Sequence, residues 1–273
     1  MKRKFILAGI VINLLAECNT NNNTGDTDKQ EATKTTPVIN YSLINICPHD
    51  TTAYIEGFLM HGGKLYESTG YTDELPQTNS LFGEVDLKRG KINRKVQLDT
   101  SKYFGEGIVF LHNKWYQLTY KTKVGFVYAD TTFKQLSTFI LPVKEGWGMT
   151  TDSTSLIISE GSDIITYAEP VSLIATKKIA VTEQSEPLDR LNELEYIIGF
   201  IYANIYGTSY IVKIDPANGK VIGNLDLSSL ADEQKNKFPG AKEMNGIAYN
   251  PSNNNVYITG KMWPNIYEIA FNH

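Results

Sequence analysis

The sequence contains few of the residues that metal sites and disulfide frameworks require. Its 273 residues include only two cysteines and four histidines. The histidines share no metal-ligand spacing, and they stand at His49, His61, His112 and His273. The chain also lacks a Gly-x-Ser-x-Gly motif and a Walker phosphate loop. These absences argue against a zinc enzyme, a serine hydrolase of that type and a P-loop nucleotide-binding protein.

The chain also lacks a strong charge of either sign and a long hydrophobic run. Its 26 basic and 30 acidic residues give a net charge of −4, so no basic surface argues for nucleic acid as a partner. The apolar segment at residues 5–16 is shorter than the roughly 20 residues that a membrane-spanning helix needs. Because Lys2, Arg3 and Lys4 precede it, the segment is typical of a signal peptide.

The end of that segment predicts a lipid anchor. The string Leu14-Leu15-Ala16-Glu17-Cys18 resembles a bacterial lipoprotein signal, except that a small residue usually stands where Glu17 is. We expect residues 1–18 to be the signal and Cys18 to be acylated. The protein would then lie in the bacterial cell envelope, in the periplasm or at the surface, with only its lipid in the membrane. Ordinary secretory cleavage nearby, with no role for Cys18, is the alternative.

A polar segment separates this signal from the folded part. Residues 19–37 are rich in Asn and Thr and nearly free of apolar residues, which predicts a flexible tether. The folded domain then covers residues 38–273. Its one cysteine, Cys47, lies in an apolar run and has no disulfide partner if Cys18 is acylated, so we expect a buried free thiol.

A short motif recurs five times between residues 56 and 247 and sets the fold class. An apolar residue follows the second motif position after nine residues in four copies and after eleven in the fifth. In a chain with 16 tyrosines and 21 glycines, this β-rich repeat predicts an all-β, five-bladed β-propeller with one blade per repeat. The copies are Glu56-Gly57-Phe58, Glu106-Gly107-Ile108, Trp147-Gly148-Met149, Asn192-Glu193-Leu194 and Asn245-Gly246-Ile247.

The two ends of the domain predict how the propeller closes. The last repeat stops at residues 265–269 without a fourth strand, whereas residues 38–44 precede the first repeat without a blade of their own. We therefore expect the N-terminal strand to complete the last blade and remove an exposed sheet edge. Short helical insertions are expected at residues 189–192 and Ser228–Lys237. Acids between the outer strands are expected to be turn residues: Asp86, Asp130, Glu169 and Asp215.

Two positions in each repeat are expected to face the mouth of the central channel. The first stands just before the second motif residue, and the second follows the apolar residue of the next strand by four. Equivalent positions form a ring, so carboxylates, amides, a lysine and aromatic rings gather there. Such a set orients a small polar substrate and moves protons, or simply binds water. The residues are Glu56, Glu106, Trp147, Asn192 and Asn245 at the first position, and Gly70, Tyr120, Gly161, Tyr206 and Lys261 at the second.

Longer strings, in order along residues 50–270, carry a family pattern. They include Phe104-Gly105-Glu106-Gly107-Ile108, Glu145-Gly146-Trp147-Gly148-Met149-Thr150, Leu191-Asn192-Glu193-Leu194-Glu195 and Thr259-Gly260-Lys261-Met262-Trp263-Pro264. These strings resemble the plant-type glutaminyl cyclases, or glutaminyl-peptide cyclotransferases. The resemblance implies a five-bladed propeller with its site at the channel mouth. It also implies conversion of the N-terminal glutamine of peptides or proteins to pyroglutamate, with release of ammonia.

The resemblance further implies roles for individual residues. Glu106 matches the family's acid–base residue, which takes a proton from the α-amine and gives it to the leaving nitrogen. Lys261 matches the family's lysine and would stabilise the oxyanion, while Asn192 would bind the reacting groups. The rest of the pocket is expected to consist of Glu56, Phe104, Tyr120, Trp147, Tyr206, Asn245 and Trp263. No cofactor is required, a structural divalent metal in the channel is suggested on family grounds alone, and we expect a monomer.

Three positions depart from the family pattern. Plant members usually have glutamine where Glu56 stands and tryptophan where Tyr120 and Tyr206 stand. A carboxylate at Glu56 would hold the substrate amine, raise the pKa of Glu106 or signal a different ligand. Two other functions are therefore open. One is a non-catalytic propeller that binds an amine-bearing ligand, and the other is a lactonase-like hydrolase with a divalent metal on Glu56, Glu106, Asn192 and Asn245.

Overall fold

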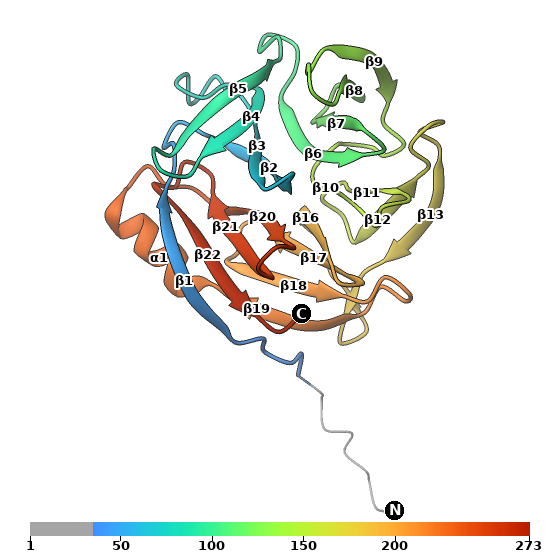
Figure 1. The fold of residues 1–273 in the computed structure, drawn as a ribbon. Helices are drawn as coiled ribbons and strands as arrows, with labels where there is room; N and C mark the ends of the chain where they lie inside the picture. Colours follow the sequence, from blue (N-terminus) through green and yellow to red (C-terminus); the bar gives the residue numbers. More distant parts are fainter. Residues whose placement is uncertain (1–34) are drawn as a thin grey trace, which may run out of the picture. The chain divides into compact units, whose positions relative to one another are not determined.

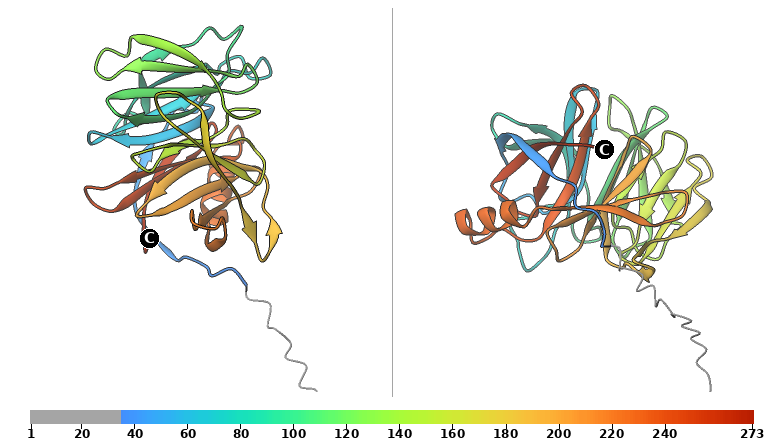
Figure 2. Two further views of the ribbon diagram at one scale, coloured as in Figure 1. Left: turned by 90° about the vertical axis from the view of Figure 1, so that its right-hand side faces the viewer. Right: turned by 90° about the horizontal axis from the view of Figure 1, so that it is seen from below.

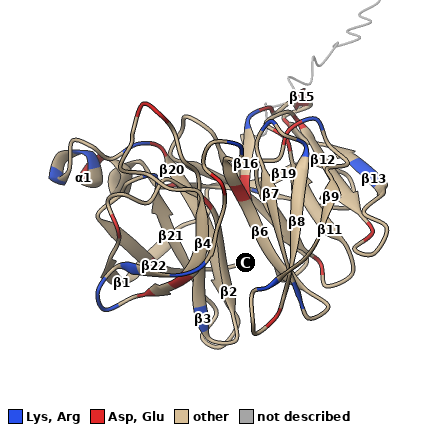
Figure 3. Cartoon of the chain, turned by 90° about the horizontal axis from the view of Figure 1, so that it is seen from above, with Lys and Arg blue, Asp and Glu red and all other residues tan. Residues whose placement is uncertain are grey.

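The computed structural model describes residues 35–273, so the predicted signal, Cys18 and most of the predicted tether lie outside the described part. Within it, five four-stranded antiparallel sheets stand around a common centre (Figure 1). The prediction of an all-β, five-bladed β-propeller is confirmed. Basic and acidic residues are interspersed over loops and outer strands (Figure 3), as the small net charge suggests.

Each blade begins with a strand at the centre and adds strands outward. The first blade contains β2 (Ile55–His61), β3 (Lys64–Thr69), β4 (Leu81–Asp86) and β5 (Lys91–Gln97). The second contains β6 (Gly105–Leu111), β7 (Lys114–Thr119), β8 (Val124–Ala129) and β9 (Gln135–Ile140). The third contains β10 (Met149–Thr151), β11 (Leu156–Ser159), β12 (Ile164–Ala168) and β13 (Ala175–Ala180). The fourth contains β16 (Leu191–Ile197), β17 (Phe200–Ile205), β18 (Tyr210–Ile214) and β19 (Val221–Asp226). The fifth contains β20 (Met244–Asn250), β21 (Asn255–Gly260), β22 (Asn265–Phe271) and β1 (Tyr41–Pro48).

The closing strand of the last blade comes from the N-terminal end of the domain, as predicted. β1 pairs antiparallel with β22, from Tyr41 opposite Phe271 to Pro48 opposite Asn265. The strand starts later than expected, because the residues before it run parallel to β19 and the backbone N–H of Asn224 donates to the Pro37 carbonyl oxygen. Cys47 lies in β1 and is a buried free thiol, which confirms that prediction.

The glycine of the repeated motif lets the inner strands of neighbouring blades approach closely. A Cβ atom on Gly57 would lie 2.7 Å from the backbone nitrogen of Ile108 in the next blade. The fourth repeat has Glu193 in this position, and its side chain crosses between strands. Glu193 Oε1 accepts a hydrogen bond from the Phe58 N–H, and Oε2 accepts one from the Ile247 N–H. This carboxyl group therefore links three inner strands.

Five clusters of buried apolar side chains fill the spaces between neighbouring blades. Phe82 of β4 and Ile108 of β6 share one cluster, for example, and Val109 of β6 and Met149 of β10 share another. Burying one large apolar side chain contributes about 1.5–3 kcal/mol. These shared clusters hold the ring together and so fix the channel mouth.

One of the two expected helical insertions is present. Ser228–Lys237 forms α1 at the periphery of the ring, with Leu230 and Ala231 buried (Figures 1 and 2). The second expectation, at residues 189–192, is wrong. Arg190 has a φ of 62°, which a right-handed helix excludes, and Leu191 already begins β16. No helix within residues 35–273 is long and apolar enough to cross a membrane.

Acids at the outer turns mostly have the structural role expected of them. The carboxylates of Asp86, Glu169 and Asp215 each accept backbone N–H groups two residues further along the chain. A hairpin that was not predicted, β14 (Thr182–Glu183) with β15 (Glu186–Pro187), joins the third and fourth blades.

Candidate active site

The first and second channel positions lie at the same end of the ring because the two inner strands of a blade are antiparallel. Ile55 at the start of β2 pairs with Thr69 at the end of β3, for example. A cavity of about 920 Å³ opens at this end and draws residues from all five blades. Its lining includes these predicted site residues: Glu56, Phe104, Glu106, Tyr120, Trp147, Asn192, Tyr206 and Lys261.

The glycines at the second channel position make room for aromatic side chains. A Cβ atom on Gly70 would lie 2.1 Å from the Phe104 ring, and one on Gly161 would lie 2.6 Å from the Trp147 ring. Real Cβ atoms do not approach this closely, so any larger residue would push the ring aside. Glycine at these two positions therefore seats the cavity walls.

Five aromatic rings follow one another around the cavity. The centroid distances are 6.1 Å for Tyr54–Phe104, 6.0 Å for Phe104–Tyr120, 6.2 Å for Tyr120–Trp147 and 5.7 Å for Trp147–Tyr206. The ammonium of Lys261 closes the circuit, 5.6 Å from the Tyr206 ring centroid and 4.6 Å from that of Tyr54. Ring faces attract a cation at such distances. We call these five residues and Lys261 the aromatic collar.

The Lys261 ammonium makes a buried ion pair with Glu56. Lys261 Nζ lies 2.6 Å from Glu56 Oε1, and the side chains are 5% and 4% exposed. Asn245 Nδ2 donates to Glu56 Oε2 over 3.2 Å. Burial raises the pKa of Glu56, and the Lys261 charge opposes that shift. Burial lowers the pKa of Lys261, but Glu56, Tyr54 and Glu106 outweigh it and leave that pKa raised.

Glu106 is the carboxyl group without such a partner. It is buried, and its Oε2 atom has no hydrogen-bond partner among residues 35–273. Burial, followed by the negative charge of Glu56, raises the pKa of Glu106 well above its ordinary value, while Lys261 opposes the shift. A carboxyl group held in this way binds a proton more readily than an ordinary glutamate does, and it can exchange that proton with a ligand in the cavity.

Asn192 is a second polar group with unused capacity in the cavity. The residue is 3% exposed, and Oδ1 has no hydrogen-bond partner in the described part of the chain. A buried acceptor without a donor is costly, by about 1–3 kcal/mol. A ligand N–H group would relieve that cost.

Two residues expected in the pocket do not line the cavity. Asn245 is fully buried behind Glu56 and also donates to the Ile55 carbonyl oxygen. Trp263 is fully buried too, because its ring packs over Gly260 and its Nε1–H donates to the Lys242 carbonyl oxygen. Asn245 therefore orients Glu56, and Trp263 supports the turn that carries Lys261.

Several residues that line the cavity are not predicted by the sequence pattern. Tyr54 was within reach of the repeat alignment, because it precedes Glu56 by two residues as Phe104 precedes Glu106. The others lie in connections that vary between blades, and no periodicity marks them. They are Tyr71, Thr72, Asp73, Glu74, Leu75, Thr100, Lys121, Lys242 and Glu243.

The donor groups near the cavity do not fit a divalent metal. Glu56 has one oxygen against an ammonium and the other against an amide N–H. Residues 35–273 contain no group of three or more His, Cys, Asp or Glu side chains arranged to hold an ion. The lactonase-like interpretation needed a metal on Glu56, Glu106, Asn192 and Asn245, whereas Glu56 has the positively charged Lys261 ammonium as its partner.

The channel mouth of this propeller is typical of an enzyme site. It holds a buried carboxyl group with an unpartnered oxygen, a lysine and an aromatic wall. The chain belongs to the glutamine cyclotransferase family, whose sequence pattern matches residues 11–271. It is 33% identical over 224 residues to the glutaminyl-peptide cyclotransferase of Arabidopsis thaliana, covering 81% of this chain and 68% of that protein. It also resembles the crystal structure of the Myxococcus xanthus glutaminyl cyclase, with a TM-score of 0.77 and 29% identity. That match covers 86% of this chain and 98% of the other.

Proposed function

We propose that this protein is a glutaminyl-peptide cyclotransferase, in which Glu106 carries the proton between the reacting groups. Family membership and the two relatives support the reaction. The observation that carries the role of Glu106 is its buried Oε2 atom, which has no partner in the described chain although the side chain lines the cavity. This feature favours a catalyst over a propeller that only binds a ligand.

The reaction moves one proton and exchanges one C–N bond for another. The free α-amine attacks the side-chain amide carbon, a five-membered ring forms, and the carbonyl oxygen becomes an oxyanion. Glu106 as carboxylate takes a proton from the attacking nitrogen and gives it to the leaving nitrogen. Ammonia departs, and Glu106 returns to its starting state.

Lys261 and Asn192 are assigned to the groups around the reacting carbon. The ammonium stabilises the developing oxyanion, and its charge is partly offset by Glu56, 2.6 Å away. The unpartnered Oδ1 of Asn192 accepts an N–H bond from the substrate amide or amine. Lys261 is held by Glu56 rather than by Glu106, so Glu106 is left to react with the substrate.

The size of the cavity determines how much of a peptide is recognised. The aromatic collar encloses the glutamine side chain. The cavity, with a volume of about 920 Å³, is larger than one residue can fill. The following residues of the substrate would pass residues 71–75 on the way to solvent. We therefore expect broad acceptance beyond the first residue, with peptides and proteins as substrates.

Ammonia release from a glutaminyl dipeptide tests the proposal directly. Purified wild-type protein should release ammonia and form the pyroglutamyl product, and the Glu106→Gln variant should lose about 100-fold or more. A folded wild-type protein without activity between pH 6 and 9 would contradict the function. Activity retained by the variant would contradict the role of Glu106 alone.

We also propose that the enzyme acts as a monomer on exported peptides and proteins, tethered to a bacterial envelope membrane by lipid on Cys18. The basic residues 2–4, the apolar residues 5–16 and the cysteine that follows support this location. Mass spectrometry of the N-terminal peptide from the native host is the test. A Cys18→Ser variant should lose the acyl mass and leave the membrane fraction.

A further inference from the structure

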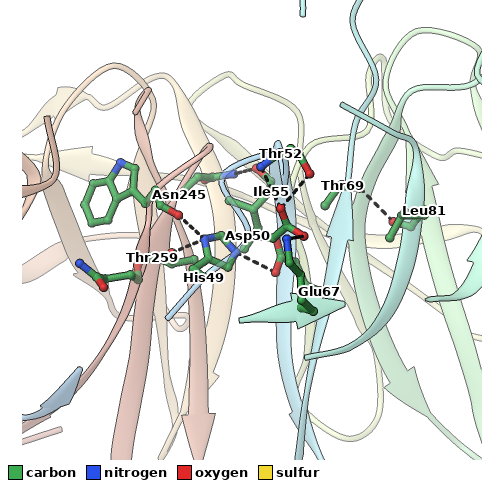
Figure 4. A network of polar contacts seen from close by, with 12 residues as sticks. His49, Asp50, Thr52, Ile55, Glu67, Thr69, Leu81, Asn245 and Thr259 are labelled. Atoms are coloured by element: carbon green, nitrogen blue, oxygen red, sulfur yellow. Dashed lines mark hydrogen bonds and ion pairs between the residues drawn. The ribbon is translucent and has the colours of Figure 1, made fainter. Parts of the chain in front are cut away.

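A buried histidine–glutamate pair lies outside the cavity, between the last blade and the first. His49 follows β1, and Glu67 lies in β3. His49 Nε2 is 2.9 Å from Glu67 Oε2, and both side chains are completely buried (Figure 4). Burying two ionisable groups costs more free energy than burying apolar ones. We therefore expect the His49–Glu67 pair to have a specific role.

The other face of the imidazole holds the turn that carries Lys261. His49 Nδ1 lies 2.8 Å from the Trp263 carbonyl oxygen, which can only accept, so Nδ1 carries the proton. The backbone N–H of His49 donates to the Pro264 carbonyl oxygen over 2.9 Å. Next to Lys261, Met262 has a φ of 60°, which is unfavourable for a side chain of this kind, and its N–H donates to the Ala53 carbonyl oxygen.

We propose that His49, oriented by Glu67, is a positioning residue that fixes the turn at residues 261–264 and thereby places the Lys261 ammonium. The order of contacts is Glu67 carboxyl, His49 ring, Trp263 carbonyl and then the backbone of Lys261 two residues earlier. The inference rests on the proposed function, because Lys261 takes its role from it. Neither His49 nor Glu67 lines the cavity, so neither touches the substrate.

The surroundings of the ring keep it in one orientation. Thr259 Oγ1 lies 3.3 Å from Nδ1 and itself donates to the Asn265 carbonyl oxygen. Burial lowers the pKa of His49, but Glu67, the Trp263 carbonyl and Asp50 outweigh burial and leave that pKa raised. The ring therefore retains both of its protons over a wider pH range and can contact Glu67 and Trp263 at once.

A double-mutant cycle between His49 and Lys261 tests the inference in the full-length protein. His49→Gln should lower kcat/KM for a glutaminyl dipeptide by roughly 10- to 100-fold, the cost of a small misplacement of a catalytic group. In a Lys261→Met background the same substitution should change kcat/KM by less than about 2-fold, since the positioned group is gone. Affinity for the pyroglutamyl dipeptide, measured by calorimetry, gives a second readout of the cycle.

Matched variants separate positioning from a loss of folding. His61 lies in β2 with its ring stacked on Phe110 at 3.7 Å, so His61→Gln removes a partly buried imidazole that has no link to Lys261. It should leave kcat/KM unchanged. If His49→Gln does not fold, Glu67→Gln keeps the side-chain volume and should show the same dependence on Lys261 with a smaller loss.

The outcomes distinguish this inference from the proposed function. A loss of similar size with and without Lys261 would mean that His49 supports the fold in general, and would overturn the positioning role. Unchanged kinetics in a His49→Gln protein that only melts earlier would also overturn it. An inactive folded wild type would overturn the proposed function and this inference together.

Discussion

Two pairs of buried carboxyl groups lie on the inner strands of this propeller, and they differ in their partners. Glu193 and Glu195 receive hydrogen bonds at all four oxygens, from three backbone N–H groups and the Thr150 hydroxyl. Glu56 and Glu106 line the cavity; the first is paired with Lys261, and the second has an oxygen without any partner in the described chain.

A raised pKa does not separate the two pairs. Burial raises the pKa of Glu193 well above its ordinary value and that of Glu195 to about 8, much as it raises the pKa of Glu106. What separates them is unused hydrogen-bonding capacity next to a cavity. Satisfied carboxyl groups tie strands together, whereas an unsatisfied one is available to a substrate.

The largest expected effect is a difference in kcat between variants of Glu106 and Glu195, one residue from each pair. Glu106→Gln should reduce kcat for ammonia release by about 10²–10⁴-fold, because the amide can neither accept nor return the proton. Glu195→Gln should leave kcat within about 2-fold, since Glu195 lies outside the cavity lining. Steady-state assays on both variants make the comparison. Similar losses in the two variants would show that burial, rather than the free oxygen, governs activity.

The second expected effect concerns stability. The folded-state pKa of Glu195, about 8, lies above its unfolded value, so the folded protein binds more protons between the two. Stability is therefore full below the unfolded pKa and falls as pH rises toward 8, by at most about 1.4 kcal/mol per pH unit.

Denaturant unfolding from pH 4 to 9 measures that slope. Glu195→Gln should flatten it in this window, while Glu186→Gln, at an exposed acid in β15, should not. A slope that is unchanged in Glu195→Gln would mean that the carboxylate is stabilised by its hydrogen bonds as fully as water stabilises it.

A third effect concerns the pH dependence of activity and the two carboxyl groups that line the cavity, Glu56 and Glu106. Glu106 must be a carboxylate to accept a proton, so activity should rise with pH through the apparent pKa of Glu106. The Glu56 charge raises that pKa. Glu56→Gln should therefore move the acid limb of the kcat/KM profile to lower pH. A shift in the opposite direction would mean that Glu56 serves mainly to hold Lys261 in place.

Most of the fold follows from the spacing of the repeat, and the exceptions have local causes. The five motifs begin the five inner strands, and the missing outer strand was identifiable from the unequal ends. The β14–β15 hairpin was not, because its turn residues Gln184 and Ser185 adopt φ values of 51° and 73° without the Asn-Gly signal of such turns. Arg190 adopts positive φ in a polar stretch that otherwise suits a short helix.

Most of the cavity was predictable from equivalent positions in the repeat, but Asn245 holds such a position and packs behind Glu56 instead of lining the cavity. Glu56, Glu106, Asn192 and Lys261 occupy repeat positions, and they do line the cavity. The burial of Trp263 depends on Gly260, over which its ring packs, and on the Lys242 carbonyl oxygen, which accepts its Nε1–H. The His49–Glu67 contact joins residues that no repeat position relates.

The smallest expected effect concerns a second negative charge that raises the pKa of Glu106, that of Glu145. Glu145 is a weaker cause of the raised pKa of Glu106 than Glu56, and its Oε2 accepts the Nε1–H of Trp147 over 3.3 Å. Glu145→Gln keeps an acceptor for Trp147 while it removes the charge. The acid limb should then move to lower pH by less than in Glu56→Gln, and by still less at high salt, because Glu145 is only partly buried and salt screens its charge. A shift as large as that of Glu56→Gln would mean that Glu145, outside the cavity lining, controls the pKa of Glu106 as strongly as Glu56 does. It would then contradict the special role given to the Glu56–Glu106 pair.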